Sequence, residues 1–242
     1  MEQTQGAGVH VLWRWQDWED RYRGRYAVVI DVLRATTTLI TVLARGAEAV
    51  LPVAGLEEAR ALARSRPGWL LGGERDNVAP PGFDGGNSPA DYPPERVAGR
   101  RLVFTTTNGT RALDRVRTGG AATVALGALV NAGAVARAAR ASGRPAVLVC
   151  AGTEGVLSLE DVLAAGAMAR YWPPEARSDE AQLAAWAYER MQADLPRALN
   201  LARHAASLRA RGLEADIGWA AREDLFDLVP VVGTQGWITA GL

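Results

Sequence analysis

Residues 27–50 read A-V-V-I-D-V-L-R-A-T-T-T-L-I-T-V-L-A-R-G-A-E-A-V. The apolar run Ala27–Val32 is typical of a buried strand, Thr37–Arg45 reads as a helix, and a second apolar run follows at Ala49–Val53. A polar, Thr-rich loop separates the first strand from the helix. This alternation of strand and helix continues along the chain. It predicts a three-layer α/β/α fold, in which a mixed sheet lies between helices.

The same unit recurs 74 residues later, where residues 101–124 read R-L-V-F-T-T-T-N-G-T-R-A-L-D-R-V-R-T-G-G-A-A-T-V. The two stretches superimpose without a gap, and a further helix and strand follow each of them. We therefore expect two duplicated βαβαβ halves, residues 25–99 and 100–172, whose equivalent loops converge on one site. The alternative left open is that any two βαβ units look alike.

The remaining elements follow the same pattern. Strands are also predicted at Val9–Trp13, Trp69–Gly72, Arg101–Thr105, Thr123–Leu126, Ala146–Cys150 and Leu228–Val232, and helices at Leu56–Ser65, Thr110–Arg117, Asn131–Ala141 and Ser158–Tyr171. After Pro173-Pro174 the composition shifts to a helical segment, residues 179–212, with helices Asp179–Asp194 and Pro196–Arg211 and with Gly212 as a cap. We expect the whole chain, residues 1–242, to form one domain.

Composition excludes several classes of protein. At 242 residues and 48% hydrophobic, the chain can bury a substantial core. All 27 basic residues are Arg and 27 residues are acidic, so the formal net charge is zero, which argues against a nucleic-acid surface. No apolar run approaches the roughly 20 residues of a membrane span, and Met1–Gly8 lacks the pattern of a signal peptide. A cytoplasmic protein is expected, with the lone Cys150 a structural thiol.

A long loop stands out in the first half. Residues 72–89 read G-G-E-R-D-N-V-A-P-P-G-F-D-G-G-N-S-P, and a loop of this length is uncommon in a compact domain unless it is functional. Glu74, Asp84, Asn87 and Ser88 offer the oxygen ligands that Mg²⁺ and phosphate sites use. A structural Ω-loop is the alternative.

Two more polar loops follow predicted strands. Asp31 ends the first strand, where open α/β sheets place ligands, and Arg34 is suited to bidentate contact with phosphate or carboxylate. The hydroxyls of Thr36 and Thr37 and the following helix N-terminus supply donors for an anion. The alternative is that Asp31 caps the helix and Arg34 pairs with it.

The equivalent loop of the second half, Thr105–Thr110, contains an Asn-Gly step. Asn108-Gly109 permits positive φ, so backbone N–H groups can turn toward an anion, and the hydroxyls of Thr106 and Thr107 add donors. A plain turn with a Thr cap is the alternative.

A third group of acids lies near Ser158. Ser158 and Asp161 have nearly the spacing of a capping box, whereas Glu160 has no such explanation and is a candidate metal ligand. With two histidines and one cysteine in the chain, the loop carboxylates favour Mg²⁺ or Mn²⁺ over a His-based zinc site. The chain has no P-loop motif, no Arg six residues after Cys150, and no second Asp two residues after Asp31. Common phosphatase and nucleotide-binding loops are therefore absent.

The ordered set of motifs resembles the 2-phosphosulfolactate phosphatase family along essentially the whole chain. The set consists of D-V-L-R-A-T-T-T, G-E followed by G-F-D-G-G-N-S-P, T-T-T-N-G-T, Asn131-Ala132, C-A-G-T-E-G with S-L-E-D, Asp216 and Val229-Pro230. The resemblance implies a Mg²⁺-dependent phosphatase that converts 2-phosphosulfolactate to 3-sulfolactate and inorganic phosphate, a step of coenzyme M biosynthesis. The segment Arg75–Pro81 is longer than the resemblance leads one to expect.

Carried over by position, the resemblance assigns three sets of residues. The catalytic set is Asp31, Arg34 and Glu74; the metal set is Asp31, Glu74, Asp84, Glu160 and Asp161; the substrate set is Thr36, Thr37, Asn87, Ser88, Thr106, Thr107, Asn108 and Gly109. The expected partner is a small phosphorylated acid, and homodimer formation is left open. Two alternatives are also left open: a phosphatase for another small phosphorylated carboxylic acid, and a non-catalytic anion-binding protein. The sequence does not choose between attack by metal-activated water and a phospho-aspartate on Asp31.

Overall fold

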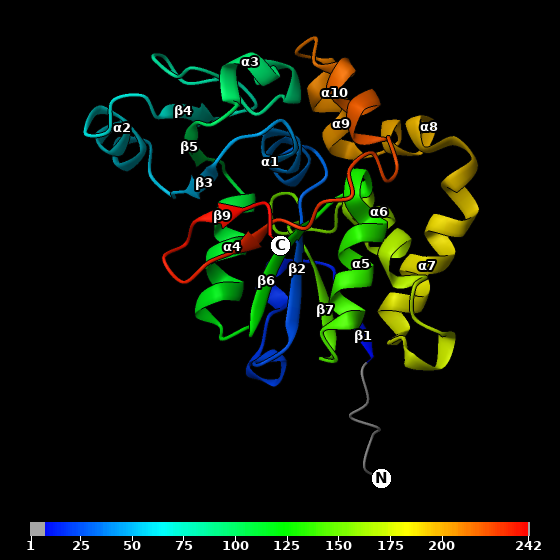
Figure 1. The fold of residues 1–242 in the computed structure, drawn as a ribbon. Coiled ribbons are helices and arrows are strands. Elements are labelled where there is room, and N and C mark those ends of the chain that lie inside the picture. The colour runs from blue at the N-terminus through cyan, green and yellow to red at the C-terminus, as the bar shows by residue number, and fades with distance from the viewer. Residues whose placement is uncertain (1–7, 242) are drawn as a thin grey trace.

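The computed structural model describes residues 8–241, in which a mixed sheet of nine strands lies between helices (Figure 1). This confirms the predicted α/β class. The strands are β1 (Val9–Leu12), β2 (Tyr26–Ile30), β3 (Ala49–Pro52), β4 (Leu70–Gly73), β5 (Arg101–Thr105), β6 (Thr123–Gly127), β7 (Ala146–Cys150), β8 (Val231–Val232) and β9 (Ile238–Thr239). The helices are α1 (Ala35–Ala44), α2 (Leu56–Arg64), α3 (Pro94–Val97), α4 (Gly109–Thr118), α5 (Ala132–Ala141), α6 (Leu159–Ala169), α7 (Asp179–Met191), α8 (Leu195–Asn200), α9 (Arg203–Arg209) and α10 (Glu214–Ala220). Within these residues no helix has the length and apolar character that crossing a bilayer requires.

The sheet consists of two parallel groups joined by a short antiparallel hairpin. Its strand order is β1-β7-β2-β6-β8-β9-β3-β5-β4, and β8 and β9 pair antiparallel with β6 and β3. The parallel strands end in register, with Ile30 beside Gly127 and Cys150, and Gly73 beside Thr105. The loops that follow these strands therefore leave from one edge of each group.

The first strand of each predicted half lies in the sheet between two strands of the other half. β2 lies between β6 and β7, and β5 lies between β3 and β4. Each parallel group thus contains one strand from one half and two from the other, in the same relative order, and the first group also contains β1, which precedes both halves. This arrangement has the symmetry that a duplication requires, but the duplication and the single-domain assignment stay predictions.

The core explains how the two groups are held together. The side chains of Val28 and Ile30 pack in the cluster that contains α5 and α6, whereas those of Ala27 and Val29 pack in the cluster that contains α1 and α4. The second cluster also includes residues of β3, β4 and β5, so α1 and α4 pack against both parallel groups. Burial of each large aliphatic side chain here contributes about 1.5–3 kcal/mol. The two helices consequently begin close to each other, and so do the polar loops that precede them.

The C-terminal segment differs from its prediction. The single helix expected over Pro196–Arg211 is wrong: α8 ends at Asn200 and α9 begins at Arg203. The Arg209 guanidinium donates to both the backbone and the side-chain oxygen of Asn200, at 3.1 and 2.8 Å, and so satisfies an acceptor at the end of α8. The short elements α3, α10 and β9 were not predicted, because two to seven residues carry too little periodicity. The expectation for Met1–Gly8 falls almost wholly on residues 1–7, outside the described residues.

Candidate functional site

A cavity of about 220 Å³ opens where the loops after β2, β4, β5 and β7 meet α6 and α9. Nine predicted site residues line it, namely Asp31, Arg34, Glu74, Asn87, Thr106, Thr107, Asn108, Glu160 and Asp161. Loops from both predicted halves therefore contribute to one cavity. Five predicted residues do not line it: Thr36, Thr37, Asp84, Ser88 and Gly109.

Asp31 directly follows β2 and keeps one free carboxylate oxygen. Its Oδ1 accepts a hydrogen bond of 3.3 Å from the backbone N–H of Ala35, at the start of α1. Its Oδ2 has no hydrogen-bond donor within residues 8–241. Loss of solvent raises the pKa of Asp31 to about 6, and the nearby charge of Glu74 adds to this effect. A cation placed beside this oxygen would therefore stabilise the ionised form of Asp31.

Glu160 lies in the first turn of α6 and, like Asp31, is poorly solvated. It is 2% exposed, and its carboxylate is near its own backbone N–H but receives no hydrogen bond from any other residue within residues 8–241. Burial raises the pKa of Glu160 to about 7, and the charge of Asp31 adds to this effect. Asp31 and Glu160 are therefore two poorly solvated carboxylates that disfavour each other's ionisation across one cavity.

Asp161 also lines the cavity, but both of its oxygens bind backbone. Oδ1 accepts from the N–H of Val32 at 2.8 Å, and Oδ2 accepts from the N–H of Gly152 at 3.1 Å. Burial raises the pKa of Asp161 well above its usual value, followed by the charges of Glu160 and Asp31. The predicted capping box of Ser158 and Asp161 is wrong, because the Ser158 hydroxyl lies 2.8 Å from that of Thr153 and does not cap α6. Asp161 instead joins the loops after β2 and β7.

Glu74 has the corresponding role after β4. Its Oε1 accepts from the backbone N–H and the hydroxyl of Thr107, at 2.9 and 3.0 Å, and its Oε2 accepts from the N–H of Asn77 at 3.0 Å. Gly73 allows this approach, because its φ is +133° and an added Cβ would lie 2.0 Å from the carbonyl oxygen of Thr105. Glu74 therefore joins the loops after β4 and β5.

The predicted metal site of five carboxylates is not formed. Within residues 8–241, no three His, Cys, Asp or Glu side chains are placed to hold one ion. Asp84 lies in a separate pocket beside Arg60, and its Oδ2 accepts from the N–H of Leu71 at 2.8 Å, because β4 is an edge strand whose backbone needs partners. Mg²⁺ commonly binds to one or two carboxylates and completes its shell with water and substrate phosphate. The free oxygens of Asp31 and Glu160 fit that requirement.

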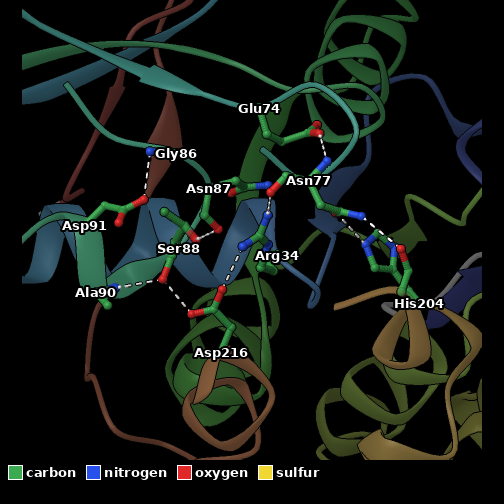
Figure 2. Close-up of polar contacts among 12 residues, drawn as sticks. Arg34, Glu74, Asn77, Gly86, Asn87, Ser88, Ala90, Asp91, His204 and Asp216 are labelled. Atoms are coloured by element: carbon green, nitrogen blue, oxygen red, sulfur yellow. Dashed lines mark hydrogen bonds and ion pairs between the residues drawn. The ribbon is translucent and has the colours of Figure 1, made fainter. Parts of the chain in front are cut away.

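Arg34 is buried and already paired. Its Nη1 lies 2.7 Å from Oδ2 of Asp216, and its Nη2 donates to the carbonyl of Asn77 at 3.0 Å (Figure 2). The guanidinium is 3% exposed and its Nε has no hydrogen-bond partner within the described residues. The pairing with Asp31 that was left open is therefore wrong. Asp216 of α10 is the partner, and this fixes the guanidinium at the cavity wall.

Ser88 is held by the same carboxylate. Its hydroxyl donates to Oδ1 of Asp216 at 2.6 Å and accepts from the N–H of Ala90 at 3.2 Å (Figure 2). Ser88 therefore positions Asp216 and does not line the cavity, and its contact with the substrate stays a prediction. The neighbouring Asn87 does line the cavity, and its buried Oδ1 has no hydrogen-bond partner within residues 8–241.

The hydroxyls of Thr36 and Thr37 also serve the fold. Thr36 donates to the carbonyl of Gly127 at 2.8 Å, and Thr37 donates to the carbonyl of Val32 at 2.8 Å. They do not line the cavity, because threonines at the start of a buried helix satisfy nearby carbonyl groups first, and their contact with the substrate stays a prediction. Gly109 is buried behind the cavity wall, where an added Cβ would lie 2.9 Å from Oδ2 of Asp31.

Asn77 was missed, although it connects much of the site. Its N–H donates to Glu74 and its carbonyl accepts from Arg34, as described above. Its Oδ1 lies 3.0 Å from Nε2 of His204, and its Nδ2 donates to Oγ of Ser207 at 3.2 Å (Figure 2). The Asp-Asn step, with φ of +54° and +66°, is a turn signal that could have indicated a fixed loop.

α9 adds a wall that was not predicted, formed by Arg203, His204 and Ser207. His204 lies between Asn77 and the hydroxyl of Thr153, whose oxygen is 3.5 Å from Nδ1. Burial lowers the pKa of His204, and the charge of Arg34 lowers it further. No local pattern reveals this wall, because its position depends on how the C-terminal helices pack.

Comparison with known proteins gives a consistent result. Residues 16–235 match the family model described as 2-phosphosulpholactate phosphatase. A protein of Symbiobacterium thermophilum named probable 2-phosphosulfolactate phosphatase is 42% identical over 221 residues, which cover 89% of this chain and 94% of that protein. Proteins with the same name from Deinococcus radiodurans and Thermotoga maritima are 43% and 39% identical, and the matches cover 89% and 86% of this chain and 90% and 89% of those proteins.

Proposed function

This chain belongs to the 2-phosphosulpholactate phosphatase family, and we propose that it hydrolyses 2-phosphosulfolactate to 3-sulfolactate and inorganic phosphate with Mg²⁺ as cofactor. One observation carries the proposal: Asp31 and Glu160 line one cavity, Oδ2 of Asp31 has no donor within residues 8–241, and Glu160 receives no hydrogen bond there from any other residue. Buried carboxylates that repel each other are stabilised by a divalent cation. A phosphate monoester brings the negative charge that such a cation would hold.

Asp31 and Glu160 would hold the metal. When bound, Mg²⁺ supplies charge neutralisation for the phosphoryl oxygens and lowers the pKa of a coordinated water. Asp161 and Glu74 support the two ligands from behind, since their oxygens fix the loops in which the ligands or their neighbours lie. Their own hydrogen bonds leave them poorly placed to coordinate directly.

The start of α4 provides the donors for phosphate. Asn108 precedes the helix and makes no side-chain cap. The N–H of Thr110 donates to the Thr106 hydroxyl at 3.3 Å, whereas the N–H groups of Gly109 and Arg111 have no acceptor within residues 8–241. Thr106, Thr107 and Asn108 line the cavity at this point. A helix N-terminus of this kind binds phosphate through its N–H groups and its dipole.

Arg34 contributes a fixed position at the cavity wall more than a net positive charge. Its pairing with Asp216 offsets the guanidinium charge, and its Nε–H, which has no partner within residues 8–241, is enclosed by the protein. A guanidinium held in this way stabilises charge that builds up in the transition state through its fixed position at the cavity wall.

The proposal is tested by phosphate release over a panel of phosphorylated acids, with chelator and with Mg²⁺, Mn²⁺ or Zn²⁺ added back. We expect release from 2-phosphosulfolactate to vanish with EDTA and to return with Mg²⁺ or Mn²⁺, with Zn²⁺ a poor substitute. Full activity after exhaustive chelation would contradict the metal assignment, and faster release from a different phosphorylated acid would reassign the substrate. The coenzyme M pathway and the cytoplasmic location stay predictions.

A further inference from the structure

The cavity carries much more negative than positive charge. Six carboxylates line it, those of Asp31, Glu74, Asp76, Glu154, Glu160 and Asp161. Two guanidinium groups line it, those of Arg34 and Arg203. A substrate with a phosphate and a further acidic group is repelled by these carboxylates, so its acidic groups are favoured only at a metal, at the start of α4 or at a guanidinium.

The two guanidinium groups are not equivalent. Arg34 is buried and lies 2.7 Å from Asp216, so its charge is already matched. Arg203 is exposed, and it forms no ion pair or hydrogen bond within residues 8–241. The pKa of His204 is lowered by burial and by the charge of Arg34, so its ring adds no positive charge at neutral pH. Arg203 is therefore the unmatched cation of the described cavity lining.

The backbone that carries Arg203 is firmly placed. The next residue, His204, and Ser207 one turn later both bind the side chain of Asn77, at 3.0 and 3.2 Å. Asn77 in turn binds Glu74 and Arg34 through its backbone. A four-residue turn closed by reciprocal hydrogen bonds between Arg75 and Val78 supports this arrangement. α9 is thereby tied to the acidic side of the cavity, and the Arg203 side chain extends from a fixed point.

We infer that Arg203 is a specificity-determining residue that binds the acidic group of the substrate remote from the phosphate, a sulfonate or a carboxylate. The inference rests on the proposed function, because it takes the phosphate to lie at Asp31, Glu160 and the start of α4. The planar guanidinium matches two oxygens of either group, which an ammonium group does not. Arg203 thus separates acid-bearing phosphate esters from uncharged ones.

The test compares Arg203→Ala and Arg203→Lys with the wild-type protein on two kinds of phosphate ester. 2-Phosphosulfolactate and 2-phospholactate carry a second acidic group, and p-nitrophenyl phosphate carries none. Arg203→Ala should raise KM for the acid-bearing esters about 10-fold or more with little change in kcat, and should alter kcat/KM for p-nitrophenyl phosphate less than about twofold. Arg203→Lys should recover part of the loss. Arg140→Ala is the matched control, since Arg140 is exposed near the end of α5 and does not line the cavity.

A binding measurement separates this inference from the proposed function. By calorimetry in the presence of Mg²⁺, Arg203→Ala should weaken binding of 3-sulfolactate about 10-fold or more and leave that of inorganic phosphate unchanged. If the wild-type protein releases no phosphate yet shows this selective loss, the proposed function fails and the role of Arg203 stands. Equal losses for 3-sulfolactate and phosphate, no loss, or no binding of 3-sulfolactate by the wild-type protein would overturn the inference.

Discussion

The loops that follow the first parallel group bring Asp31, Glu160 and Asp161 to the cavity, whereas the loop after β4 of the second group brings Glu74, and these four acids fall into two pairs that differ in their partners. Asp161 and Glu74 bind backbone N–H groups through both carboxylate oxygens. Asp31 keeps one oxygen that has no donor within residues 8–241, and Glu160 receives no hydrogen bond there from any other residue. The first pair is built into the fold, and the second pair retains capacity for a ligand. The number of acids in a site therefore says less than the number of unoccupied oxygens.

The most direct way to break this comparison is to remove the charge of the free pair. We expect Asp31→Asn to lower kcat/KM about 10³-fold, equivalent to about 4 kcal/mol of transition-state stabilisation, and Glu160→Gln to lower it about 10²-fold. Both variants should fold, because an amide oxygen can still accept the hydrogen bond from Ala35 in the first variant and from the residue's own backbone N–H in the second. Steady-state phosphate release, with thermal unfolding as the control, decides the matter. Near wild-type rates in either variant would remove that residue from the catalytic set.

The second test concerns the pair whose oxygens bind backbone, Asp161 and Glu74, for which we expect a loss of stability. Asp161→Ala leaves the buried N–H groups of Val32 and Gly152 without acceptors, so we expect the free energy of unfolding to fall by about 2–4 kcal/mol. Urea denaturation measures this loss. Glu154→Ala, at an exposed position of the cavity rim, should change stability by no more than about 0.5 kcal/mol. An Asp161→Ala protein of unchanged stability and no activity would show that Asp161 is a ligand after all.

The third test uses pH in the absence of metal. The pKa values of Asp31 and Glu160 are raised to about 6 and about 7 from 3.8 and 4.5, so the folded protein holds protons that the unfolded chain has released. Stability from these groups is present below about pH 4 and is lost as the pH rises through 6 and 7. With EDTA, Tm should therefore fall between pH 5 and pH 8. Glu160→Gln should flatten this fall and be more stable by about 1–3 kcal/mol at pH 8.

Added Mg²⁺ is the control for the pH test. It should raise Tm of the wild-type protein at pH 8 and have little effect on Glu160→Gln. A wild-type Tm that is independent of pH in EDTA would mean that the two carboxylates do not share one poorly solvated site.

The smallest expected effect is that of changing Asn77, whose backbone N–H binds Glu74. Asn77→Gly retains the left-handed backbone and its hydrogen bonds to Glu74 and Arg34, but deletes the side-chain contacts to His204 and Ser207. We expect a stability loss of about 1 kcal/mol and a rise in KM of about threefold, with kcat nearly unchanged. Asn77→Ala, which strains the backbone at φ +66°, should lose more in both respects. A glycine variant as impaired in kcat as Asp31→Asn would show that α9 acts on the chemistry directly.

The fold was largely predictable because its signals are local. Strands such as β2 and β7 are buried on both faces, so they read as continuous apolar runs, and their ends were predicted to within about two residues. The exchange of β2 and β5 was not predictable. Which of several similar parallel strands pair depends on contacts between distant segments, and no local pattern records them.

The site was predictable to a lesser extent, for a physical reason. Strand ends locate Asp31 and Glu74, and the start of a helix locates Glu160, because parallel sheets expose their carboxyl ends to ligands. A sequence cannot show whether an oxygen is already occupied. For this reason four residues that lie outside the cavity lining were assigned to the site, namely Thr36, Thr37, Ser88 and Asp84. Asp216, Asn77 and α9 reach the cavity through tertiary packing alone.

The exchange of β2 and β5 bears on how the chain reaches its native state. β2 can complete its pairing only after residue 26 meets residues 123 and 146, so formation of the central sheet must wait for chain segments made much later during synthesis. Folds dominated by such distant contacts fold slowly, since loop-closure entropy is lost before the contacts form. Neither residues 1–99 nor residues 100–242 contain a complete parallel group. A chain divided between residues 99 and 100 should therefore yield two fragments that remain unfolded alone and acquire structure only when mixed.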